Sequence, residues 1–236
     1  MGSPAMKSDT SVSPVLRLAE NSAGRDFVVG DIHGCFDLLK RRLRKLGFDK
    51  QRDRLIAVGD LIDHGQHNHQ VLKWLDKPWF HAVQGNHEVL AIQAVRDQAL
   101  RSRWYRKGGA WASRMQKRFL RQLRNALADL PVAIEVRTPA GKVGIVHADV
   151  PAGLRWREFL AALEQREQKI LDHATWSRAR QLQQCTRRVK GVQHVYVGHT
   201  PVPRPVTLGN VTNLDTGAHR SRNLSVVEIG AHCCPP

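Results

Sequence analysis

The sequence has few cysteines and no long apolar segment. Only four of its 236 residues are cysteine, and no two of them form a C-x-x-C pair. A disulfide framework or a thiolate zinc site is therefore not expected, and we predict a reducing, cytoplasmic location. No run of about 18 apolar residues occurs, so we expect no membrane-spanning helix. The opening residues also lack an apolar stretch of signal-peptide length.

Acidic and aromatic residues are also scarce. The chain has 21 Asp and Glu against 37 Lys and Arg, a formal net charge of +16, and only 6% aromatic residues. This positive field favours polyanions and phosphorylated substrates but does not determine the fold. No helix-turn-helix, zinc-finger or aromatic stacking pattern accompanies the charge, so no specific nucleic-acid partner is expected. A basic nucleic-acid-binding protein is kept as an alternative from a different class.

The length and composition indicate one folded domain. With 42% hydrophobic and 25% charged residues, the chain can bury a substantial core. We assign residues 1–14 to an expression tag and a disordered N-terminus, residues 15–230 to the folded domain and residues 231–236 to a tail. The oligomeric state is left open.

Short apolar runs that end in glycine or a polar residue recur along the chain. They are FVVGD (27–31), LIAVGD (55–60), FHAVQGN (80–86), VGIVHAD (143–149) and HVYVGHT (194–200). Their length and their valine and isoleucine content favour buried strands. Residues 36–46, ended by Gly47, and residues 87–97 have helical periodicity. Alternation of strands and helices predicts an α/β fold with a layered sheet core.

Two further regions have their own patterns. Residues 205–229 offer short strands and turns, which predicts a second, mostly antiparallel sheet. Residues 99–130 are expected to be helical and carry nine Lys and Arg side chains between Arg101 and Arg124. These cations form either a solvated helix face or a rim that collects anions, and the sequence leaves both interpretations open.

Polar side chains suited to metal binding follow the five predicted strands. Polar groups at the carboxyl ends of strands converge at one edge of an α/β sheet. Carboxylate, imidazole and amide oxygen together suit manganese, iron or zinc. Six such residues exceed the needs of one catalytic ion, so two ions are expected, bridged by Asp60 at the roughly 3.5–4 Å separation of two-metal hydrolases. The candidate ligands are Asp31, His33, Asp60, Asn86, His147 and His199.

The blocks GDIHG, GDLIDHG, GNHE, VHAD and VGHT resemble those of a known family. They are similar to the phosphoprotein-phosphatase branch of the calcineurin-like metallophosphoesterases, which includes the bacteriophage lambda protein phosphatase and related bacterial serine/threonine phosphatases. The resemblance extends to PWFHAVQGNHE, GGAW, TWSRAR and LDTGA. It implies a single-domain metallophosphoesterase fold, a layered β-sandwich of two mixed sheets flanked by helices. It also implies two divalent ions, with manganese expected and iron or zinc as alternatives.

The same resemblance implies a role for each residue. Asp31, His33 and Asp60 would hold one ion, and Asp60, Asn86, His147 and His199 the other. A metal-bridging hydroxide would attack phosphorus in line, while His87, oriented by Asp63, would protonate the leaving oxygen. Arg178 and the residue at position 64 would bind the substrate phosphate. Glu88 is expected to brace the start of its helix.

Position 64 departs from the family pattern. The family normally has an arginine there, and this chain has His64. Histidine lacks the permanent charge and the two-pronged geometry of arginine, so phosphate binding should be weaker. His64 is a natural variant, an engineered substitution or a sign of a less charged substrate such as a phosphodiester.

The resemblance implies a metal-dependent protein serine/threonine phosphatase that acts on a phosphoprotein or phosphopeptide, with phosphotyrosine as a further substrate. Hydrolysis of dinucleoside polyphosphates, or of phosphodiesters, is the alternative within the same chemistry.

Overall fold

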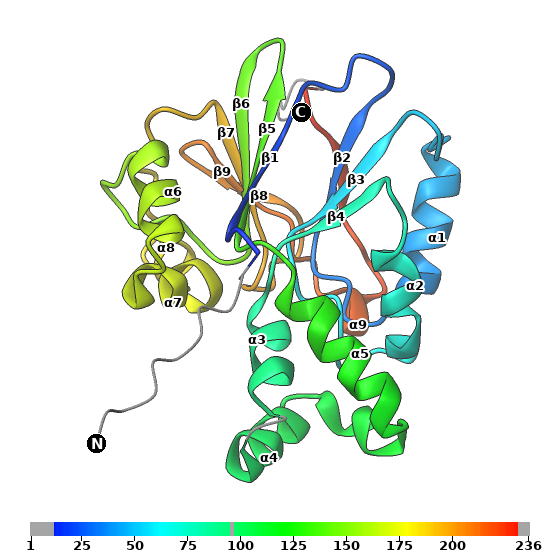
Figure 1. Ribbon diagram of the computed structural model, residues 1–236. Helices are drawn as coiled ribbons and strands as arrows, with labels where there is room; N and C mark the ends of the chain where they lie inside the picture. Colours follow the sequence, from blue (N-terminus) through cyan, green and yellow to red (C-terminus); the bar gives the residue numbers. More distant parts are fainter. Residues whose placement is uncertain (1–11, 95–96, 231–236) are drawn as a thin grey trace, which may run out of the picture.

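The computed structural model describes residues 12–94 and 97–230. The tag and tail predicted for the two ends therefore lie mostly outside the described residues. Two mixed β-sheets pack face to face, and helices cover both outer faces (Figure 1). The predicted single-domain, layered α/β sandwich is confirmed.

The smaller sheet has the strand order β10-β2-β3-β4. Strands β2 (Asp26–Val29), β3 (Arg54–Ala57) and β4 (Phe80–Ala82) run parallel, and β10 (Val226–Glu228) pairs antiparallel with β2. Parallel neighbours need crossovers, which α1 (Phe36–Lys45), η1 (Asn68–Gln70) and α2 (Val71–Leu75) supply. Helix α1 ends before Gly47, whose φ of 57° suits glycine.

The larger sheet has the strand order β1-β5-β6-β7-β9-β8. Its strands are β1 (Val15–Leu18), β5 (Ala133–Thr138), β6 (Gly141–Val146), β7 (His194–Val197), β9 (Val211–Asn213) and β8 (Val206–Leu208). Strands β6 and β7 are parallel, as are β2 and β3 in the other sheet. Helices α6 (Trp156–Glu164), α7 (Gln168–Trp176) and α8 (Ala179–Leu182) lie beside this sheet, on the left in Figure 1.

Alternation along each strand builds separate apolar layers. In β2, Phe27 and Val29 pack toward the helices of the smaller sheet, and Val28 packs between the sheets. In β7, Val195 packs toward α6 and α7, whereas Tyr196 joins Val28 in the inter-sheet layer. Since successive side chains of a strand point to opposite faces, apolar runs of this kind are buried on both sides.

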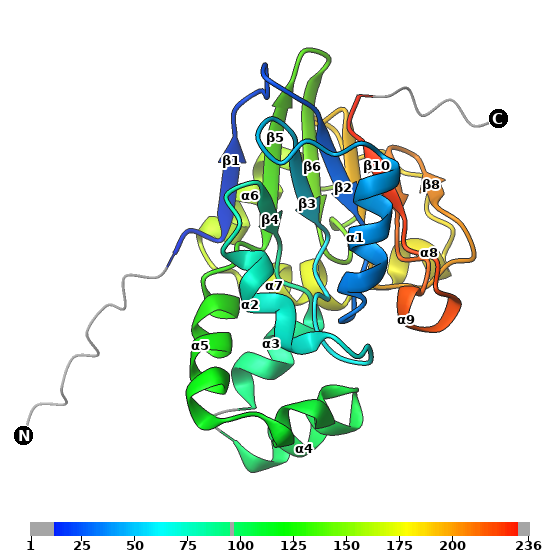
Figure 2. The same cartoon turned by 90° about the vertical axis from the view of Figure 1, so that its right-hand side faces the viewer.

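The predicted helical region is divided into shorter pieces. Helix α3 (Asn86–Gln93) ends earlier than predicted, and Asp97 instead caps α4 (Gln98–Arg106) by accepting hydrogen bonds from the backbone N–H groups of residues 99 and 100 at 2.6 and 3.2 Å. Gly108, with φ of 104°, separates α4 from η2 (Gly109–Arg114), and α5 (Lys117–Ala128) follows. Figure 2 shows α3, α4 and α5 extending below the sheets.

The prediction of a separate antiparallel sheet at residues 205–229 is wrong. Strands β8 and β9 extend the larger sheet through the parallel pairing of β9 with β7, while β10 joins the smaller sheet beyond α9 (Ala218–Ser221). Strands of three residues carry too little pattern to reveal their pairing partners. Among the described residues, no helix is long and apolar enough to cross a membrane.

Candidate metal centre

The loops after five parallel strands meet at one edge of the sandwich. Each loop delivers one or two of the candidate ligands, which come from positions as far apart as 31 and 199. All six are buried, namely Asp31, His33, Asp60, Asn86, His147 and His199. The structure thus brings together every predicted metal ligand.

Asp60 lies at the middle of this cluster. Its Oδ2 is 3.5 Å from Nε2 of His33, and its Oδ1 is 3.4 Å from Nε2 of His147. Nε2 of His147 is also 3.0 Å from Oδ1 of Asn86. Two sets of potential ligand atoms, each within 4.8 Å of one another, share Asp60: Asp31, His33 and Asp60, and Asp60, His147 and His199. This arrangement fits two cations with a common carboxylate.

Backbone carbonyls orient the histidines. Nδ1 of His33 lies 2.9 Å from the carbonyl of Ile62, and Nδ1 of His147 lies 2.8 Å from the carbonyl of Val58. Nε2 of His199 lies 3.2 Å from the carbonyl of Trp176. A ring nitrogen that donates to a carbonyl leaves the other nitrogen as an acceptor, so this arrangement prepares His33 and His147 to bind a cation through Nε2.

The electrostatics of the cluster also fit cations. Burial lowers the pKa of His33 and of His199 to about 3, so both rings are neutral, the form that binds metals. Burial and the carboxylates of Asp215 and Asp60 raise the pKa of Asp31 well above its usual range. Burial likewise raises the pKa of Asp215 to about 6. The buried acids lie close together, and the imidazoles around them are neutral. Divalent ions bound here would supply positive charge to compensate the carboxylates.

Strained backbone is concentrated at this edge. Five of the eight described non-glycine residues with positive φ belong to the predicted site: His33, Asp60, Asp63, His64 and His199. Side chains in the left-handed region cost free energy and persist where the surroundings impose them. Close packing adds to this constraint, because a Cβ on Gly198 would collide with the Asp31 carboxylate. The backbone strain is therefore concentrated at the predicted site and is not spread evenly over the fold.

Asp63 and His87 form a second unit beside Asp60. Nδ1 of His87 lies 2.7 Å from Oδ2 of Asp63. Two indole N–H groups also donate to this carboxylate, from Trp104 to Oδ2 and from Trp111 to Oδ1, each at 2.8 Å. Burial lowers the pKa of His87, but the charges of Asp60 and Asp63 outweigh it and raise the pKa to about 9. The pKa of His87 is thus shifted upward, whereas burial shifts the pKa values of His33, His147 and His199 downward.

A comparison with family models assigns the chain. The model described as "Calcineurin-like phosphoesterase" matches residues 27–212. The chain belongs to this family. A relative in Salmonella typhimurium, named serine/threonine-protein phosphatase 1, is 37% identical over 207 residues, which cover 86% of this chain and 91% of the relative.

Two other similarities carry less weight, the first because it is short and the second because the sequence identity is low. A symmetrical bis(5'-nucleosyl)-tetraphosphatase of Hamiltonella defensa subsp. Acyrthosiphon pisum is 45% identical, but over 74 residues that cover 29% of this chain and 26% of that protein. A solved structure described as a candidate diadenosine tetraphosphatase has a TM-score of 0.68 and 23% identity, with coverage of 94% of this chain and 96% of that chain. The latter supports the fold alone.

Within this calcineurin-like phosphoesterase, Glu88 braces the strand-end loops. Its carboxylate accepts hydrogen bonds from the backbone N–H groups of Asp60 at 2.8 Å, Leu61 at 2.9 Å and Gly85 at 2.8 Å. The expected bracing role of Glu88 is therefore present, and it extends from the start of α3 to the loop that carries Asp60.

His64 lies in an exposed position at the mouth of the phosphoesterase site. Its ring stacks on His219, with centroids 4.5 Å apart and an interplanar angle of 15°. It also contacts the rings of His33 and His87 edge-on, at 4.9 and 5.2 Å. Burial and the charge of His87 lower the pKa of His64, so this position lacks the positive charge of an arginine near neutral pH.

The two arginines of TWSRAR have different environments. Arg178 is exposed, and its Nε lies 3.4 Å from Nε2 of His199. Arg180 is buried and donates from Nε to Oδ1 of Asp149 at 2.6 Å. Arg178 can therefore reach a bound anion, whereas Arg180 ties α8 to the segment that follows β6.

Sequence reasoning missed three side chains at this site. Trp104, Trp111 and His219 approach Asp63 and His64 from distant segments. Trp111 lies in GGAW, which contributed to the family resemblance without indicating a role. No pattern in the sequence marks Trp104 or His219.

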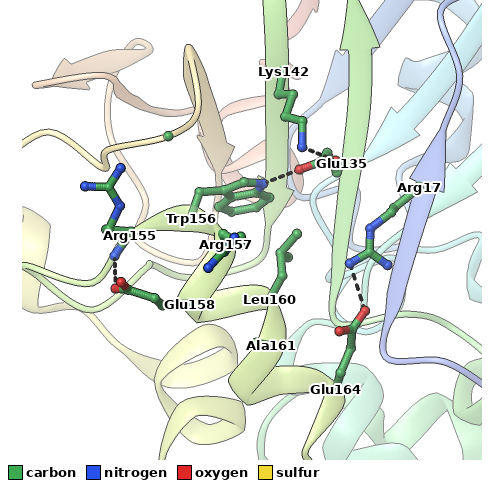
Figure 3. Close-up of a pocket in the computed structure, with 11 residues that line it drawn as sticks. Arg17, Glu135, Lys142, Arg155, Trp156, Arg157, Glu158, Leu160, Ala161 and Glu164 are labelled. Atoms are coloured by element: carbon green, nitrogen blue, oxygen red, sulfur yellow. Dashed lines mark hydrogen bonds and ion pairs between the residues drawn. The ribbon is translucent and has the colours of Figure 1, made fainter.

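A separate pocket of about 550 Å³ lies on the outer face of the larger sheet, beside α6 (Figure 3). Glu135 on its wall accepts from Nζ of Lys142 at 3.1 Å and from Nε1 of Trp156 at 2.8 Å. Arg17 pairs with Glu164 at 2.8 Å. These pairs engage four of the charged groups that line this pocket.

Proposed function

We propose that this phosphoesterase is a metal-dependent protein serine/threonine phosphatase, with phosphotyrosine as a further substrate. The observation that carries the proposal is the hydrogen-bonded Asp63–His87 pair beside Asp60, the carboxylate that two groups of potential metal ligands share. The Salmonella relative named as a serine/threonine phosphatase spans nearly the whole chain and supports a phosphoprotein substrate. Relatives named as tetraphosphatases support the alternative less strongly, since one is 45% identical over only 29% of the chain and another is 26% identical over 70% of it.

We assign the ligands as two groups that share Asp60. Asp31, His33 and Asp60 would hold one divalent ion, and Asp60, Asn86, His147 and His199 the other. The donor set suits manganese, with iron or zinc as alternatives. When bound, the two ions would supply positive charge for the phosphoryl oxygens and make water more acidic.

The remaining residues handle the substrate. His87 would donate its Nε2 proton to the leaving oxygen, since Nδ1 is engaged with Asp63. Trp104 and Trp111 hold both oxygens of Asp63, which fixes the imidazole in direction. Arg178 would bind phosphate oxygens as a permanent cation, and His64 would contribute a weaker, neutral contact.

The same proposal includes a cellular location and a binding partner. Cys35 and Cys185 are free thiols in the structure, in keeping with the proposed cytoplasmic location. A nucleic-acid-binding role gains no support from the family, and a phosphoprotein or phosphopeptide is the proposed partner.

One set of measurements tests the proposal. Protein purified without chelator should contain about two divalent ions per chain by elemental analysis and should hydrolyse p-nitrophenyl phosphate with manganese. A phosphoserine peptide should be hydrolysed with a higher kcat/KM than diadenosine tetraphosphate. Faster hydrolysis of the dinucleotide would replace the proposed substrate, and absence of metal-dependent hydrolysis would refute the proposed reaction.

A further inference from the structure

A groove between α3, α4 and α5 has no part in the proposed chemistry. It has a volume of about 500 Å³ and an apolar floor, formed by Ala91, Ala94, Trp104, Tyr105, Leu120 and Leu123. On α4 and on α5 the lining residues recur three and four positions apart, so one face of each helix is turned toward the groove. Figures 1 and 2 show these helices grouped at the end of the molecule that carries the strand-end loops, where α3 contacts both α4 and α5.

Positive charge surrounds this floor. Four cationic side chains line the groove, and no acidic side chain of the described residues does: Arg101, Lys117, Arg121 and Arg124. More broadly, none of the nine cations between positions 101 and 124 forms an ion pair with a described acid. The groove therefore presents unpaired positive charge around an apolar surface.

This charge pattern does not help α5 to form. The helix contains four cations and no acid, and Lys117 and Arg121 repel each other at i, i+4. Lys117 and Arg118 lie in its first turn, where the helix dipole disfavours positive charge. Because local stability does not account for these residues, a negatively charged ligand is the better explanation.

The groove is also connected to the proposed catalytic acid. Trp104 forms part of its floor and donates its indole N–H to Asp63. Gly109 packs directly against the Trp104 ring, and Gly108 packs against the ring of His64. A ligand in the groove would therefore contact the side chain that holds the Asp63–His87 pair, close to the mouth of the site.

We propose that this basic groove binds an acidic peptide segment that carries one apolar or aromatic side chain, within the phosphoprotein that the site hydrolyses. The apolar side chain would lie on the floor, and the acidic side chains would pair with the four rim cations. Charge complementarity selects an acidic ligand, and the apolar floor selects a peptide over a simple polyanion. The proposal rests on the proposed phosphatase function for the identity of the partner.

Binding can be measured without catalysis. The probe is a fluorescently labelled, unphosphorylated acidic peptide with a central leucine, titrated with the full chain at about 0.15 M salt and followed by anisotropy. Lys117→Glu with Arg121→Glu should weaken binding about tenfold, because two rim contacts become repulsive. The matched control, Arg114→Glu with Arg118→Glu, changes the net charge equally on exposed residues that do not line the groove. It should change binding by less than about twofold.

Three results would contradict the proposal that the groove binds an acidic peptide. They are an equal loss in the control variant, equal binding of a peptide with serine in place of leucine, and displacement by a DNA oligonucleotide or anionic phospholipid vesicles as readily as by unlabelled peptide. The last result would assign the surface to polyanions in general.

Kinetics separate this proposal from the proposed function. With the acidic segment joined to a phosphoserine, the groove variant should raise KM about tenfold and leave kcat/KM on p-nitrophenyl phosphate within about twofold. Equal losses of kcat/KM on both substrates would show that the groove residues affect the catalytic site itself. This result would contradict the proposal that the groove binds the peptide segment. A wild-type protein that binds the peptide but hydrolyses neither substrate would contradict the proposed function and leave the groove supported.

Discussion

The candidate metal centre and the basic groove balance their charges in opposite ways. At the centre, Asp60 lies within 4 Å of ring nitrogens of His33, His87 and His147, and every acid is buried among other polar groups. Along α4, η2 and α5, cations face solvent with no acidic partner among the described residues. The first region is suited to cations held inside the fold, and the second is suited to a ligand that arrives from solution.

The largest expected loss of activity is that of Asp60→Asn, at the candidate metal centre. It should lower kcat/KM on p-nitrophenyl phosphate by about a thousandfold or more, because Asp60 faces both groups of ligands. Elemental analysis should show reduced metal content. Arg118→Glu, on an exposed residue of α5, should leave both quantities within about twofold. If Asp60→Asn retained hydrolysis, the candidate metal centre would be no more important for activity than the exposed face of α5.

His87→Gln should have the next largest effect. Loss of a general acid should lower kcat on a phosphoserine peptide by about a hundredfold to ten-thousandfold. The loss should be smaller on p-nitrophenyl phosphate, because nitrophenolate leaves without a proton. His69→Gln, at an exposed histidine, is the control and should behave as wild type. Equal losses on the two substrates would argue that His87 binds substrate rather than protonating the leaving group.

The raised pKa of His87 predicts two effects of pH. The rate on phosphoserine should fall as the pH rises through about 9, because a general acid acts only while protonated. Between pH 6.5 and about 9 the folded chain holds a proton that the unfolded chain has lost. The stabilisation is therefore complete below pH 6.5 and is lost as the pH rises through about 9.

Urea unfolding at pH 6 and pH 9.5 checks the second effect. The free energy of unfolding of wild type should fall more over this interval than that of His87→Gln. Equal losses in the two proteins would mean that His87 does not hold its proton in the folded state.

His64→Arg should have the smallest effect and the opposite sign. A permanent cation with two-pronged geometry should raise kcat/KM on a phosphomonoester about tenfold, mostly through KM. His67→Arg, a nearby change that adds the same charge, is the control. If His64→Arg gained nothing on monoesters and lost phosphodiester cleavage, the preferred substrate would be the less charged ester.

The cluster of candidate ligands could be predicted because their position in the sequence determines their position in space. Asp31, Asp60 and Asn86 follow parallel strands directly, so a correct strand assignment places them at one edge. Trp104 could not be found in this way, because it reaches Asp63 from 41 residues away through the packing of α4. His219 depends in the same way on where α9 lies.

The basic helices α4 and α5 show a different limit of prediction from sequence. Their positions were predicted, but residue types alone could not show whether Arg121 faces solvent or a groove. The three-residue strands β8, β9 and β10 were misplaced for a related reason, because their partners are chosen by tertiary packing.

The two indoles on Asp63 allow the proposed proton-donating pair to be followed by fluorescence. Trp104 and Trp111 are two of six tryptophans in the chain, and both N–H groups end on the same carboxylate. Indole emission responds to nearby charge, so a change in the protonation or position of Asp63 should alter the intrinsic fluorescence. The protein thus carries an intrinsic fluorescent reporter beside its proposed general acid.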